Sequence, residues 1–255
     1  RDIRFRRFDM VVDFLSFRET NLLTWFSRAP YRVGMKRQAG GYLPFCFNRP
    51  PVVEDKTIHV AEMFQRVVTA TAEACNEVPA AGPLLVLPES TRQWVLREGP
   101  PSPLVSLYVG APVADRRWPA EYFASVADFI ADTIGASVAV LAGQAEEGIA
   151  EGVQKLCRNS GQVHVFTRLT LDQLAGVIAH SSLLVSNDTG PMHIGPAFGV
   201  PTLGLFSVGY PEHYRPLGPH SRFLRENPIE KISVETVTRT ISQIVTSLPS
   251  PHSSL

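Results

Sequence analysis

The residues best suited to chemistry lie at positions 186–193, which read Ser-Asn-Asp-Thr-Gly-Pro-Met-His. They follow an apolar run that predicts a strand and open a predicted helix, which Asp188 or Thr189 could cap. Gly190 lets a ligand approach the backbone closely, and His193 adds a side-chain donor beside that of Thr189. Because the amides and dipole of a helix N-terminus attract anions, this stretch predicts a phosphate site. An ordinary capped helix with a buried histidine would show the same pattern.

A glycine-containing turn with nearby arginines follows another predicted strand. Gly110 and Ala111 come after the apolar residues 104–109, and Arg116 stands shortly before the next predicted helix. A guanidinium beside such a turn suits a diphosphate, because its planar fork matches phosphate oxygens and it keeps its charge. The alternative is a solvated pair of arginines at a helix start.

Carboxylates follow a third predicted strand at residues 137–142. Glu146 and Glu147 could accept hydrogen bonds from the hydroxyls of a ribose or another sugar, or could simply face the dipole of the helix that they open. A fourth turn, at residues 206–211, would shape the same site more than bind to it. We expect all four turns to meet, since ligands of open parallel sheets bind beyond the carboxyl ends of the strands.

The elements that position these residues alternate strand and helix, which predicts two α/β domains with parallel sheets. We place the domains at residues 1–100 and 101–255, with a linker rich in glycine and proline at the boundary. In the first domain we expect a strand at 8–14, a helix at 19–27, a long loop at 29–51, a helix at 59–75 and a strand at 84–87. In the second we expect strands at 104–109, 137–142, 163–166, 183–186 and 202–206 and helices at 120–134, 146–157, 171–179, after 189 and at about 234–247.

Composition excludes several classes of protein. The chain has 255 residues, of which 44% are hydrophobic and 19% charged, which is typical of a soluble globular protein rather than a disordered or membrane-spanning one. Its formal net charge is zero, so no general attraction to nucleic acid is expected. The three cysteines, Cys46, Cys75 and Cys157, lack metal-ligand spacing and suit a reducing cytoplasm. Dinucleotide, Walker-loop and nucleophile-elbow motifs do not occur.

Taken together, these residues resemble the heptosyltransferases of lipopolysaccharide core synthesis, glycosyltransferase family 9. The resemblance is carried by residues 186–193 with Gly-Val-Pro at 199–201, and by residues 110–119, 143–147 and 31–34. It implies a GT-B type fold, in which two Rossmann-like domains face a cleft. It also implies inverting transfer of heptose from ADP-heptose to an inner-core acceptor, without metal or cofactor.

By this resemblance the second domain binds the donor. Residues 188–193 would meet the diphosphate and the sugar, and Arg116 would neutralise the phosphates of the departing ADP. One of the two glutamates would hold the ribose, and Leu169 would lie near the adenine. The donor-binding residues so implied are Gly110, Ala111, Arg116, Glu146, Glu147, Leu169, Asp188, Thr189, Gly190 and His193.

The resemblance also implies partners and a location. These are a nucleotide-sugar donor, a lipid-linked saccharide acceptor and the cytoplasmic side of the inner membrane, where basic residues among positions 1–8 could help peripheral docking. A GT-B enzyme for another sugar, a nucleotide-sugar epimerase and a non-catalytic nucleotide-sugar-binding protein are the alternatives.

The sequence departs from the family pattern in three ways. Arg116 stands where the family usually has lysine, and Pro196 lies inside the helix expected after residue 189, where a kink would cost about 3 kcal/mol. The family's opening strand and its aspartate base precede anything present here, so we expect an incomplete N-terminal domain and assign no catalytic residue. Asp13 is expected to be structural.

Overall fold

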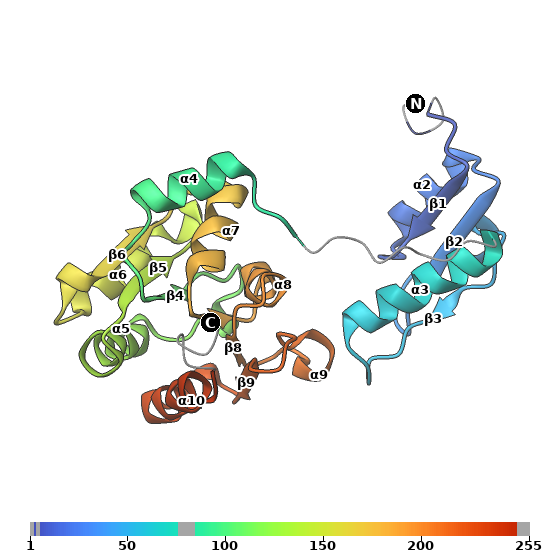
Figure 1. The fold of residues 1–255 in the computed structure, drawn as a ribbon. Coiled ribbons are helices and arrows are strands. Elements are labelled where there is room, and N and C mark those ends of the chain that lie inside the picture. The colour runs from blue at the N-terminus through green and yellow to red at the C-terminus, as the bar shows by residue number, and fades with distance from the viewer. Residues whose placement is uncertain (1–2, 4–5, 76–84, 249–255) are drawn as a thin grey trace. The chain divides into compact units, whose positions relative to one another are not determined.

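The computed structural model describes residues 3, 6–75 and 85–248. The chain divides into two compact units, Arg1–Gly82 with Glu212–Tyr214 and Pro83–Pro211 with Arg215–Leu255. Figure 1 shows the elements of both units, which are described separately below.

The first unit contains a parallel sheet in the order β1-β2-β3, whose register pairs Met10 with Tyr31 and Met35 with Val52. Helix α3 covers one face of this sheet, where its buried Met63 and Val67 pack in one cluster with residues of β2. The elements of the unit are β1 (Met10–Asp13), α2 (Arg18–Ser27), β2 (Tyr31–Lys36), a short 3₁₀ helix (Pro44–Cys46), β3 (Val52–Val53) and α3 (Val60–Cys75).

Helix α2 turns polar side chains inward and apolar side chains outward. Its buried residues are Asn21, Thr24 and Ser27. Leu22 and Phe26 are 38% and 57% exposed, although leucine and phenylalanine are usually among the most buried residues. The helix is therefore positioned by hydrogen bonds and not by an apolar inner face.

Asp13, the last residue of β1, makes the central hydrogen bonds of this arrangement. Its Oδ1 accepts the backbone N–H groups of Leu15 at 3.0 Å and Ser16 at 2.8 Å. Its Oδ2 accepts the side chains of Thr20 at 2.8 Å and Asn21 at 2.9 Å. Since both carboxylate oxygens are occupied by donors of the chain itself, the structural role expected for Asp13 is supported.

The second unit contains a six-stranded parallel sheet in the order β6-β5-β4-β7-β8-β9. The predicted alternation of strand and helix is confirmed here, and β6, β8 and α10 begin and end at the predicted residues. The elements are α4 (Glu89–Glu98), β4 (Leu104–Tyr108), α5 (Ala120–Phe129) with a wide turn (Ile130–Ile134), β5 (Ser137–Leu141), α6 (Glu147–Leu156), β6 (Val163–Phe166), α7 (Leu171–His180), β7 (Leu183–Asn187), a 3₁₀ helix (Gly190–His193), α8 (Ile194–Ala197), β8 (Thr202–Phe206), β9 (Arg222–Arg225) and α10 (Val234–Ser247). A further short helix, α9 (Pro211–Tyr214), contains residues of both units.

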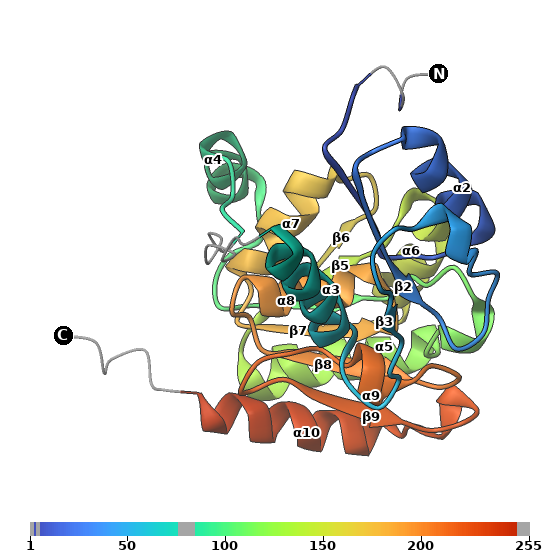
Figure 2. The same cartoon turned by 90° about the vertical axis from the view of Figure 1, so that its right-hand side faces the viewer.

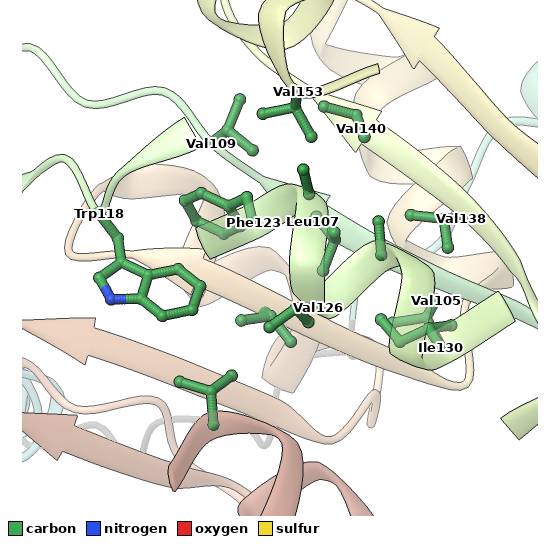
Figure 3. Close-up of a cluster of buried hydrophobic side chains, with 14 of the residues drawn as sticks. Val105, Leu107, Val109, Trp118, Phe123, Val126, Ile130, Val138, Val140 and Val153 are labelled. Atoms are coloured by element: carbon green, nitrogen blue, oxygen red, sulfur yellow. The ribbon is translucent and has the colours of Figure 1, made fainter. Parts of the chain in front are cut away.

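Helices cover both faces of this sheet. On one face α5, α6 and α10 enclose the larger apolar cluster, in which Trp118 and Phe123 are almost completely buried (Figure 3). On the other face α7 and α8 enclose a second cluster, and α4 packs against α7 (Figures 1 and 2). The strands are apolar on both faces because each face meets helices, as the sequence predicts.

Helix α4 was not predicted, and the structure places it in the second unit. It packs so closely on α7 that a Cβ atom on Gly176 would lie 2.8 Å from side-chain carbons of Thr91 and Val95. The expected boundary near residue 100 assigns this helix to the first domain, whereas the division between the units falls at Gly82 and Pro83. Helix packing, rather than the Gly/Pro-rich stretch, sets the domain boundary.

Three strand predictions for the first half and the sheet edge were wrong. The loop expected at residues 29–51 contains β2, whose central Gly34 weakens the strand pattern but leaves room for the ring of Phe47. The strand expected at 84–87 does not form at residues 85–88, where Leu85 and Val86 are exposed; Leu84 lies outside the described residues. Strand β9 was missed because it is short and carries an arginine at each end.

The kink expected at Pro196 was also wrong. The long helix expected after residue 189 is replaced by a 3₁₀ turn and the short helix α8, which begins at Ile194. Pro196 therefore lies in the first turn of α8, where backbone N–H groups need no partner within the helix.

Within the described parts of the chain, none of the helices has the length and apolarity needed to cross a bilayer.

Candidate functional site

The second unit has a topological switch point between β4 and β7. From β4 the chain proceeds to β5 and β6 on one side, and it later returns to β7, β8 and β9 on the other side. Ligands of open parallel sheets bind beyond the carboxyl ends of the strands at such a point. The turns after β4 and β7 are the ones that carry Gly110, Arg116 and Asp188.

Arg116 and Asp188 form an ion pair at this switch point. Nη1 of Arg116 lies 3.3 Å from Oδ2 of Asp188, and their side chains are 35% and 9% exposed. The Nε atom of Arg116 is buried and has no hydrogen-bond partner among the described residues. The structure thus joins the two most chemically promising turns and leaves the guanidinium partly open to solvent.

Burial dominates the ionisation of Asp188. It raises the pKa of the carboxyl above its ordinary value, and the nearby Arg116 charge acts in the opposite direction. Close packing contributes to this burial, because a Cβ atom on Gly209 would collide with Oδ2 of Asp188. The turn after β8 therefore shapes the site, which confirms its expected role.

Asn187 fixes the loop that carries Arg116. This residue is completely buried at the end of β7. Its Nδ2 donates to the carbonyl of Val109 at 2.9 Å, and its Oδ1 accepts the backbone N–H of Trp118 at 3.1 Å. Both ends of the loop between β4 and α5 are thereby held by one side chain. The signal that could have identified it is a polar residue at the end of an otherwise apolar strand.

Glu146 lies over the glycines that end β4 and β5. Cβ atoms on Gly110 and Gly143 would lie 3.5 Å and 2.7 Å from its Oε2. The same carboxylate adds to the rise that burial causes in the pKa of Tyr108, which a backbone hydrogen bond with Gly143 opposes. Only residues without a side chain leave space for a carboxylate at this position.

Glu147 is directed elsewhere. Its Oε1 accepts the hydroxyl of Thr167 at 2.9 Å, and its Oε2 lies 3.0 Å from Nη2 of Arg168. Hydrogen bonding from Arg168, followed by that from Thr167, lowers the pKa of Glu147 below its usual range. Of the two glutamates, the geometry favours Glu146 as the residue that receives a hydroxyl. Leu169 packs in the same apolar cluster as Tyr108.

The remaining predicted residues differ in their environments. Thr189 is half-buried, whereas Gly190 and His193 are exposed, so the alternative of a buried histidine was wrong. The predicted cap was also wrong, because the 3₁₀ helix that follows Thr189 has no side-chain cap. Since that helix and α8 are both short, the cation of Arg116 is a stronger source of anion affinity here than a helix dipole.

The backbone of the Arg116 loop has further supports that the sequence did not reveal. Nε of Arg117 donates to the carbonyl of Ala111 at 2.6 Å. The hydroxyl of Ser207 donates to the carbonyl of Asp115. Arg117 is therefore occupied within the loop, which leaves Arg116 as the member of the arginine pair that faces Asp188.

The described residues contain no group of three or more His, Cys, Asp and Glu side chains that could hold a metal ion.

The raised pKa of Asp188 predicts how Asp188→Asn changes stability. The folded state holds this proton more tightly than the unfolded state, so the contribution of the carboxyl is fully present below its unfolded pKa and lost as pH rises through the folded pKa. We expect the variant to have the higher free energy of unfolding at neutral pH, and the difference to vanish on acidification. Urea unfolding of both proteins across this range measures it, and a less stable variant at neutral pH would contradict the prediction.

Comparison with known proteins places this site in a family. The sequence model of glycosyltransferase family 9 (heptosyltransferase) matches residues 1–240. Lipopolysaccharide heptosyltransferase 2 of Escherichia coli is 25% identical over 88% of this chain and 66% of its own length. Lipooligosaccharide heptosyltransferase 2 of Haemophilus influenzae is 23% identical over 66% of this chain and 50% of its own length. The chain thus spans between half and two thirds of these curated relatives.

Solved structures show the fold. E. coli ADP-heptose lps heptosyltransferase II superposes with a TM-score of 0.77 at 19% sequence identity, over 96% of this chain and 78% of its own. This likeness confirms the expected GT-B type α/β fold. With a family model that matches nearly the whole chain and a site built at the expected turns, the protein belongs to glycosyltransferase family 9, the heptosyltransferase family.

Proposed function

We propose that this protein transfers heptose from ADP-heptose to an inner-core acceptor of lipopolysaccharide, with inversion and without a metal ion. The observation that carries the proposal is the Arg116–Asp188 pair at the switch point of the second unit, in a chain that belongs to the heptosyltransferase family.

Arg116 supplies what the leaving group needs. When an acceptor hydroxyl attacks the anomeric carbon from the opposite side, the bond from that carbon to the diphosphate oxygen breaks and negative charge grows on ADP. A guanidinium held in place before the reaction stabilises that charge without reorganisation. The pairing with Asp188 and the loop supports around it hold Arg116 in such a position.

The other residues of the site recognise the rest of the donor. Glu146 accepts hydrogen bonds from the ribose hydroxyls, because its carboxylate lies at the glycines that end two strands. Asp188, Thr189, Gly190 and His193 contact the sugar and diphosphate, and Leu169 lies beside the adenine. No residue is assigned as the base that removes the acceptor proton.

The acceptor is a lipid-linked saccharide, and the protein acts at the cytoplasmic face of the inner membrane. This part of the proposal is supported by the functions of the relatives, which are lipopolysaccharide and lipooligosaccharide heptosyltransferases.

Thermal unfolding with nucleotides tests the donor assignment. Saturating ADP-heptose is expected to stabilise the protein by about 2.7 kcal/mol when its concentration is 100 times Kd. Asp188→Ala should abolish the shift, whereas Arg97→Ala, which removes an exposed arginine on α4, should keep it. Uridine nucleotides serve as the control for base selectivity. The absence of any shift at millimolar ADP-heptose would overturn the proposal.

A non-catalytic nucleotide-sugar-binding protein is the second candidate. It is favoured by Asp13, whose carboxylate is saturated by hydrogen bonds within the chain and so cannot serve as the missing base. Product analysis separates the two candidates. A binder shows the thermal shift with ADP-heptose but forms no heptosylated product, and an enzyme for another sugar forms product only with a different donor.

A further inference from the structure

The first unit carries a second set of charged residues at the carboxyl edge of its own sheet. Phe17 and Arg18 follow β1, Arg37 directly follows β2, and Glu54 directly follows β3. The three strands are parallel, so these residues share the edge at which open sheets bind ligands. None of them has a role in the donor site.

Arg37 is held in a fixed orientation at this edge. Its guanidinium carbon lies 5.1 Å from the centroid of the Phe17 ring, and its Nε lies 3.6 Å from Oε1 of Glu54. Glu54 is 5% exposed, and its Oε2 accepts the backbone N–H of Gln38 at 3.0 Å. An aromatic ring and a buried carboxylate therefore orient the arginine before any ligand arrives.

The guanidinium of Arg37 is nevertheless not saturated. Its side chain is 26% exposed, and its buried Nε has no hydrogen-bond partner in the part of the chain that the structure describes. At 3.6 Å, Glu54 provides charge attraction without a hydrogen bond. The terminal N–H groups are thus available to an anion, and a guanidinium offers two of them in parallel.

A double-glycine turn brings a second arginine to the same place. A Cβ atom on Gly40 would contact Cβ of Arg37 at 3.7 Å, and one on Gly41 would lie 2.7 Å from Nε of Arg18. The turn can lie against the Arg18 side chain only because Gly41 has no side chain of its own. Arg18 is exposed, and the nearby Asp13 is fully occupied by hydrogen bonds, so the edge keeps an excess of positive charge.

We propose that Arg37, assisted by Arg18, recognises a phosphate or carboxylate group on the saccharide acceptor. The inference rests on the proposed function and names the acceptor as an anionic saccharide. Phe17 and Glu54 are positioning residues in this site, because they act through the orientation of Arg37.

Binding of two acceptor saccharides to the full chain tests the proposal without turnover. One probe is a phosphorylated core saccharide stripped of fatty acids, and the other is the same saccharide after removal of its phosphates by a phosphatase. Arg37→Gln is expected to raise Kd for the phosphorylated probe at least about 10-fold, since hydrogen bonds to charged groups are this strong. Arg37→Lys should recover part of the loss, and Kd for the dephosphorylated probe should change little.

Arg49→Gln is the matched control. Arg49 also lies over an aromatic ring, with its guanidinium carbon 4.8 Å from the centroid of Tyr31, but Tyr31 begins β2 and so lies at the opposite edge of the sheet. This variant should bind both probes like the wild type. Equal effects of the two variants, or equal loss of both probes in Arg37→Gln, would overturn the proposal.

Two further measurements separate saccharide recognition at Arg37 from binding of free phosphate and from a failure of the donor site. Inorganic phosphate that competes as strongly as the phosphorylated saccharide would indicate a site for free phosphate and would also overturn the proposal. The stabilisation by ADP-heptose should be unchanged in Arg37→Gln. A failed donor assignment would appear as no stabilisation in any variant, while the probe binding would still report on Arg37.

Discussion

Replacing Arg116 with alanine is expected to lower kcat for heptosyl transfer by about 10²–10³-fold, the usual cost of removing one preorganised donor from a developing negative charge. The variant should fold, because the Arg116 side chain is 35% exposed and belongs to neither apolar cluster. Steady-state kinetics with ADP-heptose and a saccharide acceptor measure the effect. KM for the acceptor should change much less than kcat.

Arg116→Lys distinguishes the charge from the shape of this side chain. Lysine preserves the positive charge but loses the planar fork, so kcat should lie between those of the wild type and Arg116→Ala. Arg97→Ala is the control for loss of an exposed arginine. Wild-type kcat in Arg116→Ala would show that the guanidinium does not act on the leaving group.

Asn187→Ala should destabilise the protein by about 3 kcal/mol, because it leaves the carbonyl of Val109 and the N–H of Trp118 buried without partners. Urea unfolding measures the loss directly. We also expect weaker stabilisation by ADP-heptose at temperatures where the variant is folded, since the loop that carries Arg116 is no longer fixed at its ends.

Asn48→Ala provides a control with the same chemistry at an exposed position. Asn48 accepts the backbone N–H of Arg32 at 2.8 Å and donates to the carbonyl of Pro30 at 2.7 Å. Because water can replace these bonds, the cost should be about 1 kcal/mol or less. Similar losses in both asparagine variants would show that burial of the Asn187 bonds has no special weight.

The second unit could be predicted well because its strands are buried on both faces. Continuous apolar runs such as residues 202–206 then mark each strand, and amphipathic stretches such as residues 234–247 mark each helix. The site residues followed from the same reasoning, since the ends of parallel strands fix where a ligand can bind.

The first unit resisted prediction because its local rules are reversed or weakened. Helix α2 buries Asn21 and exposes Phe26, so hydrophobic periodicity indicates the wrong face. Strand β2 is interrupted by Gly34, whose reason is a ring from a distant part of the sequence. Such contacts join residues far apart in the chain, and no local pattern encodes them.

Pairing within the site was equally hidden. The sequence offered Glu146 and Glu147 as equal candidates, and only the structure shows that one lies over two glycines while the other pairs with Arg168. The contact of Arg116 with Asp188 depends on the return of the chain to β7 beside β4. These features are set by topology, which spacing in the sequence does not specify.

The Asn187 bridge has a consequence for affinity. By joining Val109 to Trp118 it converts the intervening segment into a ring closed by hydrogen bonds. Ring closure removes chain entropy during folding, so that loss need not be repeated when a nucleotide binds. A short amide side chain far from any phosphate can thereby increase the strength with which one is held.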